Sequence, residues 1–415
     1  MLPTVVTLVM DAVGLTTLDY LLDKFPGEVH LPHFQRMGLG NILAARHHSR
    51  IRPEDNPQLS YALHQVSAEA DSVIGHREMV GVTDPRQYEL FFSGFSAEYI
   101  RALEQKIGRR TLYNEMAGGM EAIEKNSEEH TRTGWPIVYS SVCDPLIQIA
   151  TDEAVIPVEE AHRITDAAFD LAMEMGIPIT RAISRTYVLR DGEVVRTPNR
   201  YDRVLGLDKP TLLDVLKEAG ISLVSVGKPA ELVLSSLWDN KIKLSNPEDL
   251  EPGLGLRFVH PKHKDTNPYS IQGTLQALRE AESNGTFVFV NCVDTDSLYG
   301  HTQQVEGSLR SIEEIDRCVP RIVQEMREGD ILLVTADHGM LHAGDRTYHT
   351  ELPPQFSNYG YHHREPVPLL GLRKGGDLND IRVPTTDTFA AVGHIAAQVF
   401  GVKERYVSLT SFSEK

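Results

Sequence analysis

Short apolar stretches alternate with amphipathic helix patterns in the outer parts of the chain. Three of these stretches, Val5–Met10, Phe287–Cys292 and Ile331–Thr335, consist almost wholly of apolar and β-branched residues. Such runs are typical of strands that are buried on both faces. Their alternation with helices predicts an α/β fold built on a mostly parallel sheet flanked by helices.

Two helix patterns between these strands have clear ends. Pro210 opens one of them and Gly220 closes it, because proline favours the first turn of a helix and glycine the position after the last turn. The other has an apolar face from Ile312 to Met326 and contains Pro320. We expect a kink there, since proline lacks the N–H that a continuous helix needs.

The middle of the chain interrupts this alternation. It contains amphipathic helix patterns at 97–106 and 157–175 and a strand-like segment, PIVYSS. We therefore expect residues 97–204 to form an inserted, smaller α+β cap domain over the strand ends. Residues 1–96 and 205–415 would then form the core.

Acidic residues follow each of the three apolar strands. Asp11 follows the first, Asp296 comes shortly after the second, and Asp337 and His338 follow the third. Ligands of open α/β sheets bind just beyond the carboxyl ends of the strands. We therefore expect these side chains to converge on one site.

The residue types at these strand ends suit divalent metal ions. The candidate ligands are Asp11, Asp296, His301, Asp337, His338 and one histidine near position 362. Carboxylates together with imidazoles favour Mn²⁺, Zn²⁺ or Fe²⁺. Two sets of three ligands leave coordination positions for a phosphate oxygen and a nucleophile, which two-metal phosphoryl transfer requires. Taken singly, each residue could be a helix cap or a turn residue; their occurrence on three separate strands favours metal binding.

The last histidine of this set is not determined by spacing. His342, His349, His362 and His363 all follow the Asp337-His338 pair. Each has a side chain that could complete a second set of three, and the pattern alone leaves all four open.

Composition and charge limit the partners. The chain has 415 residues and a formal net charge of −17, which argues against nonspecific binding to nucleic acid or to an anionic membrane. It contains no apolar run long enough to span a membrane, and its first residues lack the basic region of a signal peptide. The three cysteines lie at unrelated spacings, which favours a reducing, cytoplasmic compartment over a disulfide framework.

Several motifs together resemble the phosphopentomutase branch of the alkaline phosphatase superfamily. They are ADSVIGH, NCVDTDSLYGH, VTADHG and YHHREPVPLLG, with TGWPIVYSSVCDPLIQIATDEAVIP and ISRTYVLRDGEVVRTPNRYD in the middle segment. The resemblance covers nearly all of the chain from about Gln65 onward. It implies an alkaline-phosphatase-like core that carries a cap domain.

The resemblance also implies roles for individual residues. One metal ion would be held by Asp296, His301 and His362, and the second by Asp11, Asp337 and His338. Mn²⁺ is the expected metal, with Zn²⁺ as the alternative. Ser72 falls at the position of the nucleophile, although without the resemblance a serine in this loop would be interpreted as a turn residue.

Four cations and one acid match positions that hold the substrate in the family. Phosphate binding is implied for Arg185, Arg196, Arg200 and Lys228, because guanidinium groups bind phosphate oxygens in pairs and lysine acts as a point charge. Asp144 matches the acid of the cap that faces the sugar. Taken alone, Arg196 could belong to a solvated basic strand, and Asp144 could be a turn residue before Pro145.

The implied reaction interconverts ribose or deoxyribose 1-phosphate and 5-phosphate through a phosphoserine, with a sugar bisphosphate as activator. Ala70 and Arg77 stand where the family has lysine and tryptophan, and residues 12–60 lack its acidic, glycine-rich loop. The arginine-rich cap favours the mutase, whereas these differences leave open, as an alternative, a metal-dependent phosphatase or phosphonate hydrolase acting on a small phosphorylated metabolite. A non-catalytic sensor of such metabolites is a third interpretation, against which the complete ligand set argues.

Overall fold

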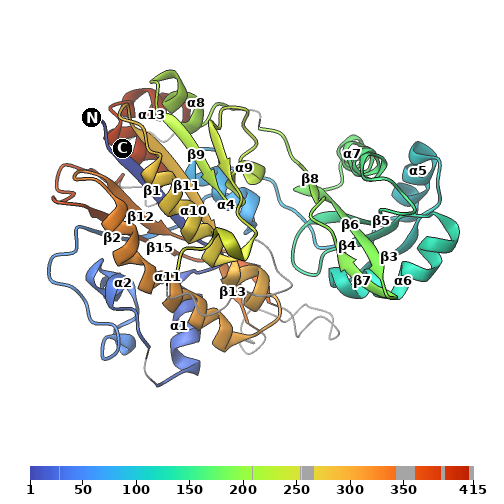
Figure 1. The fold of residues 1–415 in the computed structure, drawn as a ribbon, viewed down its shortest axis with the longest axis horizontal. Coiled ribbons are helices and arrows are strands. Elements are labelled where there is room, and N and C mark those ends of the chain that lie inside the picture. Colours follow the sequence, from blue (N-terminus) through green and yellow to red (C-terminus); the bar gives the residue numbers. More distant parts are fainter. Residues whose placement is uncertain are drawn as a thin grey trace. The chain divides into compact units, whose positions relative to one another are not determined.

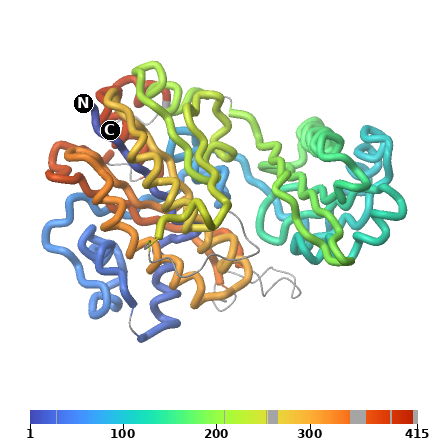
Figure 2. Tube along the Cα trace, viewed as in Figure 1, coloured from blue at the N-terminus to red at the C-terminus, as the bar shows by residue number. Residues whose placement is uncertain are grey.

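The protein consists of two compact units. The computed structural model describes residues 1–27, 29–207, 209–252, 254, 266–342, 360–384 and 388–410. The described residues of the first unit lie within 1–85, 207–348 and 358–415, and those of the second unit lie within 86–206. Figure 1 labels the elements, and Figure 2 shows by colour that both chain ends belong to the first unit.

A seven-stranded sheet forms the centre of the first unit. Its strands, in spatial order, are β10 (Asn240–Ile242), β9 (Ser222–Val226), β11 (Thr286–Cys292), β1 (Thr4–Met10), β12 (Ile331–Thr335), β15 (Val367–Arg373) and β2 (Leu59–Leu63). The pairs from β10 to β12 are parallel, whereas β15 is antiparallel to both of its neighbours. Every residue of β1, β11 and β12 is buried, as expected for central strands covered on both faces.

The direction of β15 decides which of its residues lie at the edge of the sheet where the parallel strands end. Because β15 runs opposite to the parallel strands, its first residue lies at the edge where those strands end. The short strand β14 (Tyr361–His363) precedes β15 and pairs with β13 (Gly339–Leu341), which follows β12. The residues just before β15 therefore lie beside the residues just after β12.

Helices cover the sheet in two groups. The helices of this unit are α1 (Leu15–Lys24), α2 (Pro32–Arg36), α3 (Leu39–Ile42), α4 (Ser72–Met79), α8 (Leu212–Glu218), α9 (Pro229–Leu232), α10 (Asn267–Arg279), α11 (Val305–Glu325), α12 (Ala390–Val399) and α13 (Lys403–Thr410). Helix α10 packs against α11, which also contacts α1 and α2, while α12 packs against α4, α8 and α13. Figure 1 shows α10 and α11 lying across the sheet.

The helix predicted between Pro210 and Gly220 differs from expectation at its start, whereas the kink expected at Pro320 stays a prediction. The helix predicted to open at Pro210 begins two residues later, at Leu212. Thr211 is its cap, because the Thr211 hydroxyl accepts the Leu213 N–H while the Asp214 carboxylate accepts the Thr211 N–H. Pro320 lies inside α11, which continues past it to Glu325 as one element.

The second unit is built on a six-stranded mixed sheet. Its strands are β3 (Leu112–Met116), β4 (Ile137–Ser140), β5 (Leu146–Asp152), β6 (Arg181–Arg190) and β7 (Glu193–Arg196) in that order, with β8 (Tyr201–Val204) also paired to β6. Helices α5 (Ala97–Ile107) and α7 (Val158–Glu174) pack together, and α6 (Gly119–Thr133) contacts β3, β4, β5 and β7. The helices predicted at 97–106 and 157–175 are confirmed as α5 and α7.

In the part of the chain that the structure describes, no helix combines the length and apolar character needed to cross a membrane.

Candidate metal centre

The carboxyl ends of three adjacent parallel strands meet at one edge of the sheet. Asp11 follows β1, and its N–H donates to the carbonyl of Cys292, the last residue of β11, at 2.9 Å. Asp337 comes two residues after the end of β12. The structure therefore brings together the acids that the sequence places after separate strands.

Asp296, His301 and His362 form a first group. The Nε2 atoms of His301 and His362 each lie 3.1 Å from Asp296 Oδ1. A π-helical turn, η3 (Thr295–Gly300), sets the spacing of the first two: the His301 N–H donates to the Asp296 carbonyl at 3.2 Å. This wider turn places residues five apart on one face, and such turns are frequent at functional sites.

Asp11, Asp337 and His338 form a second group, and all three are fully buried. His338 Nε2 lies 3.6 Å from both Asp11 Oδ1 and Asp337 Oδ2. Ala12 adopts a left-handed conformation, with φ of 62°, and its N–H donates to Asp337 Oδ1 at 3.1 Å. A non-glycine residue in this region is strained, and here the strain accompanies an amide that orients a candidate ligand.

The two groups adjoin each other. The rings of His338 and His362 lie 3.9 Å apart. Ligand atoms of Asp11, Asp296 and His338 also fall within 4.8 Å of one another. Lys228 joins the cluster, with its Nζ 3.3 Å from Asp11 Oδ2 and 4.0 Å from Asp296 Oδ2.

The electrostatics of the cluster suit a cationic ligand. Burial and the neighbouring charge of Asp337 raise the pKa of Asp11 to about 6, although Lys228 opposes this shift. Burial also disfavours the charged form of Asp296, but His301 and His362 outweigh it and hold its pKa well below the usual range. Closely spaced buried carboxylates are costly unless positive charge compensates them, so this donor set fits divalent metal ions.

Ser72 lies against the second group at the start of α4. Its Oγ is 3.3 Å from His338 Nε2 and 3.5 Å from Asp11 Oδ1. Asp71 caps the helix by accepting the Val73 N–H at 2.8 Å. A Cβ on Gly75 would come within 2.1 Å of the Asp337 carbonyl oxygen. Only glycine therefore permits this close approach of α4 to the end of β12.

The four histidines left open by spacing lie in different surroundings. His362 sits beside Asp296 as described above, and His363 follows it in β14. His342 is 1% exposed, its ring stacks on Tyr20, and neither ring nitrogen has a hydrogen-bond partner among the described residues. His349 lies outside the described residues.

The second unit gathers three arginines. Burial and the charges of Arg200 and Arg196 lower the pKa of Arg185 to about 9, while its Nε donates to Gln148 Oε1 at 3.1 Å. Arg200 forms a bidentate pair with Asp202, both contacts measuring 2.6 Å. Guanidinium groups placed this close repel one another, so the cluster favours an anion.

Asp144 also belongs to the second unit. Its Oδ1 lies 3.4 Å from Arg181 Nη2, and its Oδ2 accepts from the Ser141 hydroxyl at 3.3 Å. Within its own unit, this carboxylate is therefore held by a cation and a hydroxyl.

Two buried residues that contact the acids were missed by sequence reasoning. Asn291 is fully buried in β11 and donates from Nδ2 to Asp11 Oδ2 at 3.1 Å. His76, fully buried in α4, places Nδ1 3.3 Å from Asp337 Oδ2. A signal was present for Asn291, because it is the one polar amide in an apolar strand.

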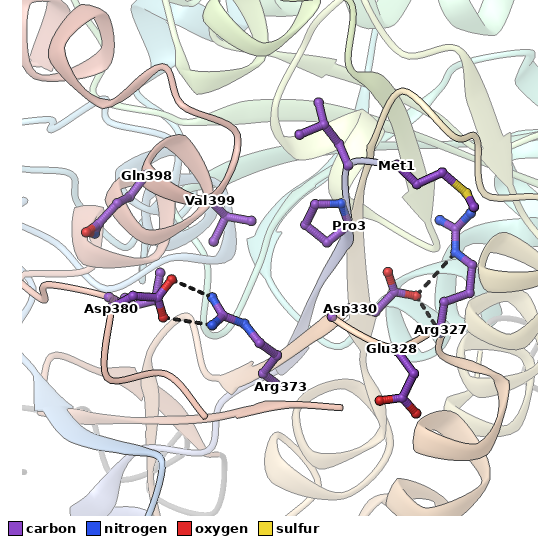
Figure 3. Close-up of a pocket in the computed structure, with 12 residues that line it drawn as sticks. Met1, Pro3, Arg327, Glu328, Asp330, Arg373, Asp380, Gln398 and Val399 are labelled. Carbon is purple, nitrogen blue, oxygen red and sulfur yellow. Dashed lines mark hydrogen bonds and ion pairs between the residues drawn. The ribbon is translucent and has the colours of Figure 1, made fainter. Parts of the chain in front are cut away.

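A separate cavity lies elsewhere in the first unit. It has a volume of about 590 Å³ and opens beside the amino-terminal ends of β1 and β12. Two ion pairs line it, Arg327 with Asp330 and Arg373 with Asp380, as Figure 3 shows. None of the predicted site residues lines it.

Comparison with known proteins identifies close relatives along the whole chain. The phosphopentomutase of Desulfitobacterium hafniense is 35% identical over 397 residues, which cover 94% of this chain and 90% of that protein. The phosphopentomutase of Thermotoga petrophila is 34% identical over 380 residues, covering 91% and 87%. That of Caldanaerobacter subterraneus is 32% identical over 421 residues, covering 97% and 95%.

A family model and solved structures add broader likenesses. Residues 258–404 match the metalloenzyme superfamily. The phosphoglycerate mutase of Leishmania mexicana gives a TM-score of 0.45 at 12% identity, covering 97% of this chain and 96% of that one. A protein of the alkaline phosphatase superfamily from Vibrio parahaemolyticus gives 0.43 at 11% identity, covering 97% and 67%. Because the sequence relatives match nearly the full length, the chain belongs to the phosphopentomutase family and is an isomerase-type metalloenzyme.

Proposed function

We propose that this enzyme interconverts the 1-phosphate and 5-phosphate of ribose or deoxyribose, with Ser72 as the group that carries the phosphoryl. The observation that carries the proposal is the position of the Ser72 hydroxyl, 3.3 Å from His338 and 3.5 Å from Asp11. A buried hydroxyl at a cluster of carboxylates and imidazoles is the arrangement that phosphoryl transfer uses.

The six clustered residues would hold two divalent metal ions. Asp296, His301 and His362 would bind one, and Asp11, Asp337 and His338 the other. Mn²⁺ is the proposed metal and Zn²⁺ the alternative, since the ligands are carboxylates and imidazoles without thiolates. When bound, such ions neutralise the charge that develops on the entering and leaving oxygens.

The protein's own groups would orient the phosphoryl and its acceptor. Ser72 is held at the amino-terminal end of α4, where the helix dipole favours negative charge. The first half-reaction starts from phosphorylated Ser72. The bond from Ser72 Oγ to phosphorus breaks as the free hydroxyl of the sugar phosphate bonds to that phosphorus, the hydroxyl proton passes to Ser72 Oγ, and the product is a bisphosphate. In the second half-reaction, the Ser72 hydroxyl accepts the other phosphoryl group of the bisphosphate. The sugar oxygen that loses this group takes the serine proton and becomes the free hydroxyl of the product.

The second unit would supply the phosphate and sugar contacts. Arg185, Arg196 and Arg200 form a cluster whose mutual repulsion a phosphate dianion would relieve. Asp144 would accept a hydrogen bond from a sugar hydroxyl. Lys228, in the first unit, would add a positive charge beside Asp11 and Asp296.

Phosphorus NMR tests the proposal directly. The Mn²⁺-loaded protein is mixed with ribose 5-phosphate and a trace of sugar bisphosphate, and the spectrum is followed over time. We expect the signal to move to the position of the 1-phosphate. Release of inorganic phosphate alone would refute the mutase and support the hydrolase alternative, and an unchanged spectrum would refute the pentose substrate.

A further inference from the structure

Asn291 and His76 form a buried network of polar contacts between Asp11 and Asp337, the two acids of the second ligand group. Asn291 Nδ2 lies 3.1 Å from Asp11 Oδ2 and 3.2 Å from His76 Nε2. On the other side of its ring, His76 Nδ1 lies 2.8 Å from the Ser72 carbonyl oxygen and 3.3 Å from Asp337 Oδ2. Asp11, Asp337, His76 and Asn291 are all 0% exposed. Bulk solvent therefore does not reach any of these groups.

The donors and acceptors of this network permit one arrangement of hydrogens. A carboxylate only accepts, so the atom of Asn291 that faces Asp11 must be its NH₂ group. The second hydrogen of that group points to His76 Nε2, which must then be the acceptor nitrogen. Nδ1 consequently carries the ring hydrogen and donates it to the Ser72 carbonyl, while Asp337 Oδ2 lies 3.3 Å away as an electrostatic neighbour. The ring of His76 is thereby held in one tautomer and one orientation.

The three elements that carry these groups are held together independently. Strands β1 and β11 are paired along their whole length. Helix α4 approaches the Asp337 main chain at Gly75, the residue immediately before His76. The contacts of Asn291 and His76 therefore join β11, α4 and the segment after β12 next to the Asp11 and Asp337 carboxylates.

We propose that His76 and Asn291 are positioning residues that orient the Asp11 and Asp337 carboxylates, and the main chain of Ser72, for binding of the second metal ion. The inference rests on the proposed function, in which Asp11, Asp337 and His338 hold that ion. Groups that hydrogen-bond to metal ligands fix the ligand orientation. Removal of such a group typically weakens metal affinity about 10- to 100-fold.

The test measures Mn²⁺ affinity at each site in the full-length protein. Calorimetric titration of metal-free protein should show two binding events in the wild type, and elemental analysis checks the stoichiometry. In Asn291→Leu and His76→Ala, we expect one of the two events to weaken about 10- to 100-fold. In the part of the chain that the structure describes, no hydrogen bond or ion pair is recorded between the first ligand group (Asp296, His301 and His362) and His76 or Asn291. The affinity of that site should therefore stay within about twofold and serve as an internal reference.

Two further variants separate positioning from general support of the fold. His76→Asn retains a donor near the place of Nδ1, so it should recover part of the affinity that His76→Ala loses. His130 is a matched control in the second unit, because it is also 0% exposed and also bonded at both ring nitrogens, to Trp135 at 2.7 Å and Asp152 at 3.0 Å. His130→Ala should lower thermal stability and leave both metal affinities unchanged.

The outcomes distinguish this inference from the proposed function. If folded Asn291→Leu and His76→Asn bind two Mn²⁺ ions with wild-type affinity, the positioning role is wrong. Should His76→Ala fail to fold, those two variants still decide the question. If Asp11→Asn and Asp337→Asn themselves leave both binding events intact, the ligand assignment in the proposed function fails, whatever the effect of His76.

Discussion

Replacing Gly75 by alanine should disable the enzyme through a steric clash at its centre. The added Cβ would lie 2.1 Å from the Asp337 carbonyl oxygen, whereas ordinary contact begins at 3.4 Å. The clash is between a Cβ atom and a main-chain carbonyl oxygen, so it cannot be relieved by the movement of a flexible side chain. Helix α4 would have to retreat by roughly 1.3 Å in a close-packed interior. Ser72 and His76, on the same helix, would retreat with it.

The size of the effect follows from this displacement. A misplacement of about 1 Å in a catalytic constellation can lower the rate about 100-fold. Forcing an extra methyl group into a packed core costs about 1–3 kcal/mol of folding free energy. We therefore expect Gly75→Ala to fold, to unfold at a lower temperature, and to lose at least about 100-fold in kcat.

The assay compares kcat by phosphorus NMR with thermal unfolding by circular dichroism. Gly27→Ala is the matched control, because a Cβ at Gly27 would have nothing within 4 Å. It should change neither quantity. If Gly75→Ala keeps kcat within about threefold of the wild type, the argument that this contact sets the position of Ser72 is refuted.

Three other predictions concern the ligands and the nucleophile. Ser72→Ala should abolish turnover while elemental analysis still finds two metal equivalents; normal turnover would mean that another group carries the phosphoryl. His362→Ala should lose one metal equivalent and His342→Ala none, and the reverse result would reassign the ligand. In the metal-free protein, the pKa of Asp11 is raised to about 6 by burial and Asp337, so protons compete with the cation there. Mn²⁺ affinity should fall as pH drops through about 6. Lys228 lowers that pKa, so Lys228→Met should move the fall to higher pH. A flat affinity between pH 5.5 and 8 would contradict this account.

The central strands and the acids after them could be predicted because their signals are local. Each of β1, β11 and β12 is a run of apolar residues that ends where the chain turns toward a polar site. The end of α8 near Gly220 could also be predicted from the sequence, but the start of the helix could not. Proline at 210 suggested the first turn, but the helix begins after Thr211, because the hydrogen bonds between Thr211 and the first turn make Thr211 the cap.

Spacing alone could not choose among the histidines; the family resemblance implied His362, and the tertiary structure shows how it reaches Asp296. His362 reaches Asp296 because β14 pairs with β13, opposite Met340, and no local pattern encodes that pairing. The same applies to His76 and Asn291, whose importance comes from contacts between residues more than 200 positions apart. The π-helical turn at Thr295–Gly300 could not be predicted from helix propensity either, since such turns are rare.

The reversed strand β15 has a consequence for which histidine can serve as the last candidate ligand. The last candidate ligand lies 24 residues after His338, yet its place is set by the pairing of β13 with β14 at one end and by entry into β15 at the other. The register of these strand pairs therefore fixes where His362 lies, whatever its distance from His338 along the sequence. A slip of β14 by one residue against β13 would bring Tyr361 or His363 opposite Met340 in place of His362. The identity of the last candidate ligand thus depends on strand register.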